Sequence, residues 1–358
     1  MDYVKLMRKG LKVYNAMRRK VIERSDTKVC KRRITGEKPL TKEQKKQIEE
    51  FYAPYHKVNT ASHELYYEKT GMFSVKFLPK FLYTNYVDEY FNARQEGKYL
   101  DNKCYYPTIF AGINQPGFAV MRMGKFWYDS NMNIVSYDEV RRIISEEKEL
   151  FLKIATESYG GKGVEHISAE KGNMFEQFET YVNGVNADII AQHPIKQHPA
   201  YSAINESSVN TIRIMSLLTE EGVKIYSAIL RCGMKGKKVD NITVGGVTCG
   251  ISEDGTLKKY AYNSKAQKFE KHPTNDFVFE GYKLPYFEQA KEMVMKAHPM
   301  VPHFRLVSFD IAIGEDGEPI FVEANLCKGS AEIHEFNNGP LFGDDTEKIL
   351  DEVFGKNK

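Results

Sequence analysis

The chain is poor in the features that mark secreted and membrane-spanning proteins. Its five cysteines are odd in number and never stand in a CxxC pair, so they indicate neither a disulfide framework nor a zinc site. No apolar run approaches the ~20 residues that a transmembrane helix needs. The first twenty residues also lack the apolar core of a secretory signal. We therefore expect a cytoplasmic protein whose cysteines are reduced thiols.

What is present is typical of a globular protein with an uneven charge. Of the 358 residues 42% are hydrophobic and 28% charged, which argues against disorder and suggests two or three packed domains. The net charge of +3 hides an asymmetry. Residues 1–48 hold 16 Lys/Arg and 5 Asp/Glu, a net charge of +11, whereas the remaining 310 residues hold 35 and 43, a net charge of −8. A basic arm thus precedes a mildly acidic body.

The basic arm has an apolar stripe at helical spacing. Its members include Val4, Met7, Leu11, Tyr14 and Met17. One interpretation is a helix that packs this stripe on the body. The other is an interfacial helix on anionic lipid, in which residues 1–35 make a peripheral membrane contact. The sequence has no base-stacking platform and no helix-turn-helix signature, so nucleic acid is not an expected partner.

Local signals divide the rest of the chain. A break at 35–41 precedes a polar helix that begins at Thr41, and Ser136 is placed to cap a helix over 136–149. From residue 207 onward the chain is β-rich, with hairpins and one amphipathic helix before a closing helix. The predicted domains are a basic helical extension, a region preceding the first lobe, a first lobe and a second lobe, over residues 1–59, 60–135, 136–200 and 201–358.

The last predicted hairpin carries three oxygen ligands. Asp310 lies in its first strand, and Glu323 and Asn325 lie at the end of its second. The turn brings Asp310 near Glu323, and residues two apart point to one face of an extended chain. Two carboxylates and an amide oxygen suit Mg²⁺ that also holds nucleotide phosphates. The alternative is a hairpin with acids on its solvated face.

A second motif combines a lysine in an apolar strand with a glycine-rich loop. Lys153 stands in FLKIA, where an ammonium group needs a partner phosphate or carboxylate. The following SYGGKGV contains adjacent glycines, whose N–H groups approach phosphate oxygens closely, and Lys162 adds a cation. The spacing is not that of a Walker A loop. The alternative is a plain glycine turn.

Arginines mark a third motif. In SVNTIRI, alternation places Asn210, Ile212 and Ile214 on one face and Thr211 and Arg213 on the other, and Arg231 ends the partner strand. Planar guanidinium groups suit triphosphate oxygens or a substrate carboxylate. The alternative is a pair of surface arginines on a half-buried hairpin.

These motifs occur together in an order that resembles the ATP-grasp superfamily, and in particular its sugar-transfer-associated group, which is related to alpha-L-glutamate ligases. The matching text lies within residues 100–335. Its pieces, in chain order, are LDNKCYYPTIFAG, FLKIATESYGGKGV, DIIAQHPIKQHPAYSAINESSVNTIRI, AILRCGMKGKKVDNITVGGV and VSFDIAIGEDGEPIFVEAN. The resemblance implies an α+β fold in which two α+β lobes clasp a nucleotide, here with an N-terminal helical extension.

The resemblance also implies roles for individual residues. Lys103 resembles the nucleotide-binding lysine that precedes the first lobe. Lys153 resembles the strand lysine that binds the α- and β-phosphates. The loop that closes over the triphosphate corresponds to Ser158, Gly160, Gly161 and Lys162. The linker that meets the adenine edge corresponds to Gln192, His193 and Ile195. Family linkers often carry an acid for the ribose, whereas this linker carries Gln192, Lys196, Gln197 and His198.

The substrate and metal ends of the site follow in the same way. The catalytic residues implied are Arg213, Arg231 and Asn241, although Asp240 stands where the glutamate ligases have an arginine. The magnesium ligands implied are Asp310, Glu323 and Asn325.

The reaction implied is an ATP- and Mg²⁺-dependent ligation of a carboxylate to an amine through an acylphosphate. The substrates would be small molecules or glycan-linked groups, in the modification of a cell-surface polysaccharide or glycoconjugate. Two alternatives stay open. One is a kinase on the same fold that phosphorylates a small acceptor, and the other is a non-catalytic nucleotide-binding scaffold.

Overall fold

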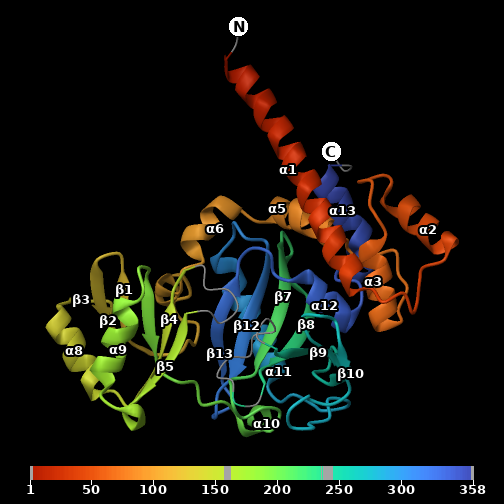
Figure 1. Cartoon of the computed structure of the whole chain (residues 1–358). Coiled ribbons are helices and arrows are strands. Elements are labelled where there is room, and N and C mark those ends of the chain that lie inside the picture. The colour runs from red at the N-terminus through yellow and green to blue at the C-terminus, as the bar shows by residue number, and fades with distance from the viewer. Residues whose placement is uncertain (1–2, 157–162, 235, 237–244, 356–358) are drawn as a thin grey trace. The chain divides into compact units, whose positions relative to one another are not determined.

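The computed structural model describes residues 3–156, 163–234, 236 and 245–355, which form two compact units (Figure 1). Unit 1 consists of Met1–Phe91, Lys265–Gln267 and Ser330–Lys358. Unit 2 consists of Asn92–Ser264 and Lys268–Gly329. The chain therefore leaves unit 1, builds unit 2, and returns to unit 1 for its last segment. The sequence had assigned that segment to a second lobe over 201–358.

Unit 1 is helical. Its elements are α1 (Tyr3–Arg33), α2 (Lys42–Tyr52), α3 (Ala61–Thr70), α4 (Lys80–Leu82), the π-helical η1 (Tyr83–Val87), α5 (Asp88–Phe91), α12 (Ala331–Asn338), η7 (Gly343–Asp345) and α13 (Thr346–Phe354). The predicted start at Thr41 is confirmed, because its side chain accepts the N–H of Gln44 while the Gln44 side chain accepts the N–H of Thr41. The basic arm is helical as predicted. The described members of its apolar stripe are exposed rather than packed on the body, with Leu11 at 59% and Met17 at 64%.

A carboxyl group lies in the core of unit 1. Glu335 on α12 is fully buried, and its Oε1 accepts the backbone N–H groups of Leu78 at 2.9 Å and Leu341 at 3.2 Å. Burial raises the pKa of Glu335 to about 8, although these N–H donors and the Tyr66 hydroxyl partly offset that rise. Glu335 therefore binds a proton more tightly in the folded than in the unfolded chain.

This buried acid makes the stability of unit 1 fall as pH rises. Since the folded-state pKa lies above the ordinary value of 4.5, the folded state holds the extra proton, and unfolding becomes easier between about pH 4.5 and 8. Glu335→Gln, which resembles the protonated acid, should raise the melting temperature at pH 9 by roughly 5 °C and leave it little changed at pH 5. Thermal unfolding followed by circular dichroism across this range measures the effect. Glu347→Gln on the exposed side of α13 is the control, and an equal shift there would contradict the prediction.

The first sheet of unit 2 is six-stranded and antiparallel, in the order β3-β2-β1-β6-β4-β5. Its elements are β1 (Phe118–Met123), β2 (Phe126–Asp129), β3 (Ile134–Val135), α8 (Tyr137–Glu146), β4 (Glu149–Ile154), β5 (Val164–Ser168), η4 (Ala169–Lys171), α9 (Met174–Asn183) and β6 (Ile189–Gln192). The Ser136 side chain caps α8 as predicted. Asn173 caps α9, since its side chain accepts the N–H of Glu176. Strands β1–β3 join this sheet, so the sheet begins well before the predicted lobe boundary at residue 136.

One face of the six-stranded sheet is apolar because β4 alternates. Leu150 and Leu152 are buried together with Val140 and Ile144 of α8 and Phe178 of α9. The intervening side chains of β4 point to the other face. Lys153, which is predicted to bind the nucleotide, follows Leu152 and therefore lies on that second face.

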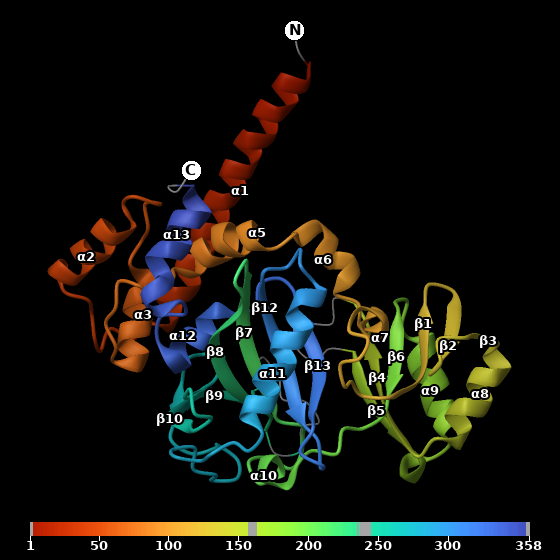
Figure 2. The same cartoon turned by 180° about the vertical axis from the view of Figure 1, so that it is seen from behind.

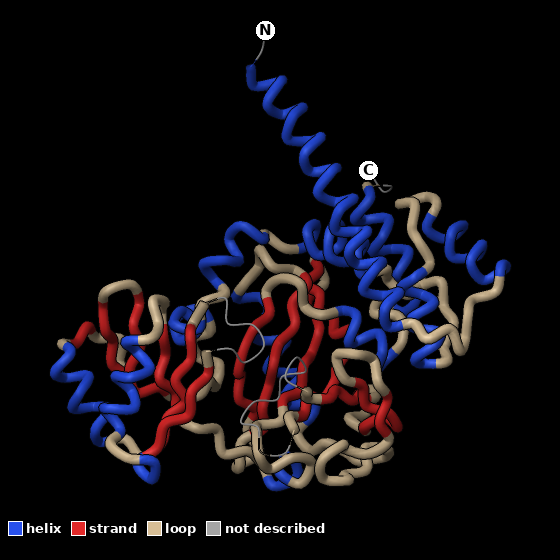
Figure 3. The backbone as a smooth tube through the Cα atoms, viewed as in Figure 1, coloured by secondary structure: helices blue, strands red, loops and turns tan. Residues whose placement is uncertain are grey.

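The second sheet of unit 2 is seven-stranded and antiparallel, in the order β11-β10-β9-β8-β7-β12-β13 (Figure 3). Its strands are β7 (Thr211–Thr219), β8 (Gly222–Cys232), β9 (Val247–Ile251), β10 (Leu257–Tyr262), β11 (Lys268–Phe269), β12 (Leu306–Ile313) and β13 (Pro319–Asn325). The three hairpins expected from turn chemistry are all present. The remaining elements of unit 2 are α6 (Arg94–Leu100), η2 (Lys103–Tyr105), α7 (Tyr106–Ile109), α10 (Pro199–Ser202), α11 (Phe287–Ala297) and η6 (His298–Met300).

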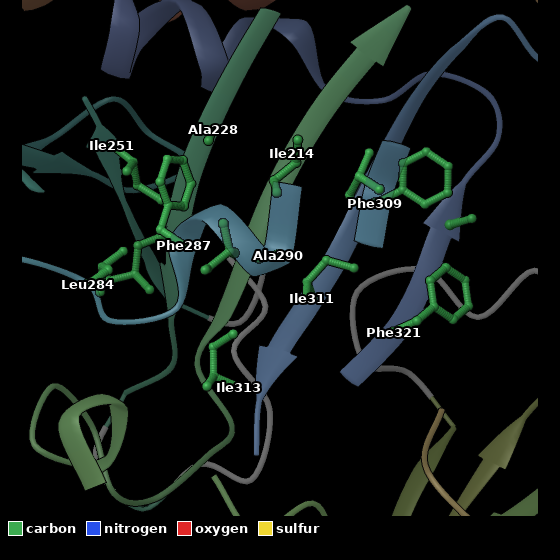
Figure 4. Packing of buried hydrophobic residues seen from close by; sticks show 14 of the residues in the cluster. Ile214, Ala228, Ile251, Leu284, Phe287, Ala290, Phe309, Ile311, Ile313 and Phe321 are labelled. Atoms are coloured by element: carbon green, nitrogen blue, oxygen red, sulfur yellow. The ribbon is translucent and has the colours of Figure 1, made fainter. Parts of the chain in front are cut away.

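Helix α11 covers one face of this second sheet (Figure 2). Phe287 and Ala290 of the helix lie against Ile214 of β7 and Ala228 of β8 (Figure 4), and all four are buried. Each large apolar side chain removed from water in this way stabilises the fold by about 1.5–3 kcal/mol. Because strands alternate, the residues between these core positions are left on the opposite face.

None of the five cysteines is joined in a disulfide. Among the described residues no helix is both long and apolar enough to cross a bilayer.

Candidate functional site

The face of the seven-stranded sheet opposite α11 brings the predicted metal-binding hairpin together with the first arginine. Asp310 in β12 stands opposite Arg213 in β7 and opposite Glu323 in β13. Residues paired across antiparallel strands point to the same face, so these three side chains are neighbours. Asn325 stands opposite Ser308, two residues before Asp310, and shares that face. The predicted proximity of Asp310 and Glu323 is confirmed.

The Asp310 carboxylate lies between two guanidinium groups. Arg213 donates from Nε to Oδ1 and from Nη2 to Oδ2, both at 2.7 Å, and Arg231 donates from Nη1 to Oδ2. Asp310 is 1% exposed and the two arginines are 8% and 7% exposed. The cluster is therefore a buried ion-pair network in which Arg213 and Arg231 share the carboxylate of Asp310.

The charge on Asp310 is secured by these arginines. Burial alone would raise the pKa of the Asp310 carboxyl, but the charges of Arg213 and Arg231 and the hydrogen bonds from Arg213 and Asn325 outweigh it and lower the pKa below 3.8. Asp310 is consequently ionised throughout the neutral range.

Lys103 connects the two sheets of unit 2. Its backbone N–H donates to the carbonyl of Ala155, just after β4, at 3.0 Å. Its Nζ donates to Oε1 of Glu323 at 3.1 Å. Burial would lower the pKa of Lys103, yet Glu323, Asp101 and Asp310 raise it, so the side chain stays cationic.

Lys153 lies on the face of the six-stranded sheet opposite its apolar core. The Lys153 Nζ donates to Oε1 of Gln192, the last residue of β6, at 2.8 Å. Lys153 thus alternates with the buried Leu152 rather than interrupting the apolar layer, and its ammonium group has a polar partner. Two predicted nucleotide-binding residues, Lys153 and Gln192, are brought together in this way.

The linker after β6 is held by its first residue. The backbone N–H of His193 donates to the carbonyl of Gly117 at 2.8 Å, and its Nε2 lies 3.0 Å from Glu147 Oε1. This N–H is therefore committed within the protein. Ile195 is half-buried two residues further on. Because the His193 N–H is already bonded, an adenine edge that meets this linker would need a main-chain group further along the chain. The predicted residue Ile195 lies there.

Several predicted site residues lie outside the described residues. They are Ser158, Gly160, Gly161, Lys162 and Asn241. The end of the glycine-rich stretch is described at Gly163, whose carbonyl accepts the Ile154 N–H at 3.1 Å and the Tyr181 hydroxyl at 2.6 Å. Glycine is required at this position, because its φ is +74° and a Cβ added there would lie only 2.5 Å from Ile154 Cδ1.

The comparisons with known proteins identify the family of the chain. The family model described as "Sugar-transfer associated ATP-grasp" matches residues 82–349, which is most of the chain. The chain belongs to this ATP-grasp family. The resemblance inferred from the motif order is thereby confirmed, and with it the α+β ATP-grasp fold. No curated protein matches the chain.

Solved structures similar to this ATP-grasp protein are distant. They include D-cycloserine synthetase DcsG, with 16% identity, a TM-score of 0.41, and coverage of 72% of this chain and 70% of that one. A D-alanine–D-alanine ligase from Bacillus anthracis has 14% identity, a TM-score of 0.39, and coverage of 71% and 65%. The ATP-grasp ligase PsnB, in complex with a precursor peptide and AMPPNP, has 13% identity, a TM-score of 0.41, and coverage of 74% and 62%. The chain thus spans about two thirds of these proteins, and the family assignment rests on the family model.

The predicted magnesium ligands of the ATP-grasp protein suit a hard cation by their chemistry. Asp310, Glu323 and Asn325 supply carboxylate and amide oxygens at neighbouring register positions on one face. Within the described part of the chain, no group of three or more His, Cys, Asp or Glu side chains is placed to hold a metal. The predicted magnesium ligands do not form a group of that composition, because they are two carboxylates, Asp310 and Glu323, and one amide, Asn325. A cation here would share Asp310 with its arginines and Glu323 with Lys103.

The sequence analysis placed Thr211 on the Arg213 face without giving it a role, and it named neither Thr248 nor Ser308. Thr211 and Thr248 both stand opposite Arg231, and all three are buried. Ser308 is buried as well, and its hydroxyl donates to the carbonyl of Gly329 at 2.9 Å. Alternation from Asp310 would have identified Ser308, because it lies two residues earlier in the same strand.

Proposed function

We propose that this ATP-grasp protein is an ATP- and Mg²⁺-dependent carboxylate–amine ligase. The observation that carries the proposal is the buried Arg213–Asp310–Arg231 cluster beside the Lys103–Glu323 ion pair. It gathers three cations around two carboxylates on one sheet face, and a fourth cation, Lys153, stands on the other sheet of the same unit. Such a concentration of cations suits an anion as highly charged as a triphosphate.

The chemistry takes two balanced steps. A substrate carboxylate oxygen attacks the γ-phosphorus of ATP, the bond to the β-phosphate oxygen breaks, and ADP leaves an acylphosphate behind. An amine then attacks the acyl carbon, and the carbon–oxygen bond to phosphate breaks, with its electron pair leaving on phosphate. The attacking nitrogen loses one proton, and an amide forms. The protein contributes positioning and charge neutralisation to both steps.

Roles for the side chains follow from their places. Lys153 and Lys103 bind phosphate oxygens, while Arg213 and Arg231 neutralise the γ-phosphate and the acylphosphate. Asp310, Glu323 and Asn325 would hold Mg²⁺, which when bound supplies further neutralisation of charge on the phosphate oxygens. Asn241 and the loop residues Ser158, Gly160, Gly161 and Lys162 complete the predicted set.

The substrates proposed are a small-molecule or glycan-linked carboxylate and an amine, in cytoplasmic modification of a cell-surface polysaccharide or glycoconjugate. The support for a sugar connection is the family's description as sugar-transfer associated. Uronic acids and amino acids are therefore the first carboxylates to test, because both classes occur in such polymers.

Hydroxylamine trapping tests the reaction type directly. The full chain is incubated with ATP, Mg²⁺, hydroxylamine and each carboxylate of the panel, and ADP, phosphate and hydroxamate are quantified. A ligase yields the three products in equal amounts, because hydroxylamine replaces the amine. A phosphorylated acceptor without hydroxamate would identify a kinase instead, and nucleotide binding without any of these products would favour the non-catalytic scaffold.

A further inference from the structure

Helix α1 presents an apolar stripe that nothing in the described part of unit 1 covers. The stripe consists of Met7, Leu11, Tyr14, Met17 and Val21, whose exposed fractions lie between 59% for Leu11 and 72% for Met7. At about 100° of turn per residue the five lie within an arc of about 120°. Large side chains so exposed, and aligned on one helix face, mark an interaction surface.

The opposite side of α1 fastens the helix to unit 1. Cys30 is buried, and its Sγ lies 3.7 Å from the Ser62 hydroxyl. The Arg19 guanidinium stacks 4.6 Å above the Tyr86 ring, and Arg33 donates to Glu332 at 2.8 Å. The first of these three contacts along the helix is that of Arg19, and Figures 1 and 2 show the earlier turns of α1 extending beyond the other helices of unit 1. The stripe is not the face that holds the helix in place.

The charge of α1 is almost entirely positive. Its 31 residues contain only two acids, Glu23 and Asp26, and both are half-buried. The exposed charged side chains described on α1 are all cationic and are Arg18, Lys20, Arg24, Lys28, Lys31 and Arg32. The described outward surface of α1 therefore combines an apolar stripe with exposed cations.

We infer that α1 docks unit 1 on the surface of an anionic lipid bilayer. The stripe enters the interfacial region, where apolar side chains leave water, while lysines and arginines remain among the anionic headgroups. Flexible aliphatic stems let Lys and Arg bury their methylenes while keeping the charge in the headgroup layer. Membrane binding by α1 involves unit 1 alone and does not depend on the reaction proposed for unit 2.

The charges argue against a second copy of the chain as the occupant. Continuing the seam of Met7, Leu11, Tyr14 and Val21 at heptad spacing reaches Arg18 and Lys28. A two-stranded coiled coil would place these cations against their own copies, and its apolar seam would span only about two heptads, fewer than sustained pairing needs.

Vesicle co-sedimentation of the full chain tests the inference. We expect binding to phosphatidylcholine vesicles containing about one third phosphatidylserine, weak binding to pure phosphatidylcholine, and release by high salt. Leu11→Gln/Met17→Gln should weaken the binding at least about tenfold. Arg24→Gln/Lys28→Gln should weaken it about twentyfold. Glutamine keeps the helix propensity, and an unchanged melting curve verifies folding.

The control is Lys42→Gln/Lys46→Gln on α2, which removes the same charge from exposed positions of unit 1 and should leave binding unchanged. Absence of wild-type binding to the anionic vesicles would overturn the inference. So would equal binding by the Leu11/Met17 variant, since the stripe would then play no part. A wild-type dimer that the Leu11/Met17 variant converts to a monomer, without vesicle binding, would assign the stripe to a second copy instead.

Discussion

Asp310→Asn is expected to destabilise unit 2 and to abolish ATP turnover. The amide keeps the shape of the side chain but leaves Arg213 and Arg231 buried without the carboxylate that both now bind. Removing one partner of a buried ion pair costs about 3–5 kcal/mol. In a unit of this size that corresponds to a fall in melting temperature of roughly 10 °C. Circular dichroism measures the fall, and ADP release at a temperature where the variant stays folded should drop at least about a hundredfold.

The pH dependence gives this prediction a second readout. Because the folded-state pKa of Asp310 lies below the ordinary 3.8, its stabilising contribution is complete above that pH and is lost as pH falls through the folded pKa. The variant should therefore be less stable than the wild type at every pH from about 4 to 9, and the two should converge only in stronger acid.

A matched control separates the effect of burial from the effect of replacing a carboxylate by an amide. Asp254→Asn alters the same group in an exposed ion pair with Lys283 at 3.0 Å. Its melting temperature and ADP release should stay close to the wild type, since exposed pairs contribute little. If Asp310→Asn behaved like this control, the Arg213–Asp310–Arg231 cluster would be neither a structural nor a functional centre.

Lys153→Met is expected to weaken nucleotide binding with little effect on folding. Methionine preserves the volume of the side chain but removes the ammonium group that now meets Gln192. A hydrogen bond from a charged donor to phosphate is worth about 2 kcal/mol, so the dissociation constant should rise about thirtyfold. Calorimetric titration with Mg²⁺ and a non-hydrolysable ATP analogue measures it.

Lys148→Met is the control for this substitution. Lys148 is exposed and directly precedes β4, so its replacement removes a charge near the same strand without reaching the polar face. If the wild type binds the ATP analogue and Lys153→Met binds it with the same affinity, the nucleotide does not bind at this face of the six-stranded sheet.

Local chemistry predicted most individual elements. The capping pattern at Thr41, the turns of the hairpins and the alternation around Arg213 all depend on residues close in sequence, and all are found in the structure. The segment 331–338, for which the sequence analysis named no helix, forms α12. It becomes helical because tertiary burial of residues such as Glu335 and Phe336 outweighs local propensity.

The domain boundaries were harder to predict. Strands β1–β3 join β4–β6 through the pairing of β1 with β6, whose residues Met121 and Ile190 are 69 positions apart. Unit 1 combines the first helices with residues 330–358. Non-local pairings of this kind leave no periodic trace in the sequence, and a linear division of the chain misses them.

The sequence by itself determined the family and the hairpin that pairs Asp310 with Glu323, because these depend on motif order and on the two-residue period of a strand. Only the tertiary structure decided which charges meet: that Arg213 and Arg231 share Asp310, that Lys103 reaches Glu323, and that the stripe of α1 is exposed. The reason is physical. A buried charge must find its counter-charge among strands that are distant in sequence, and the register that supplies it is fixed by packing of the apolar face on the other side of the sheet.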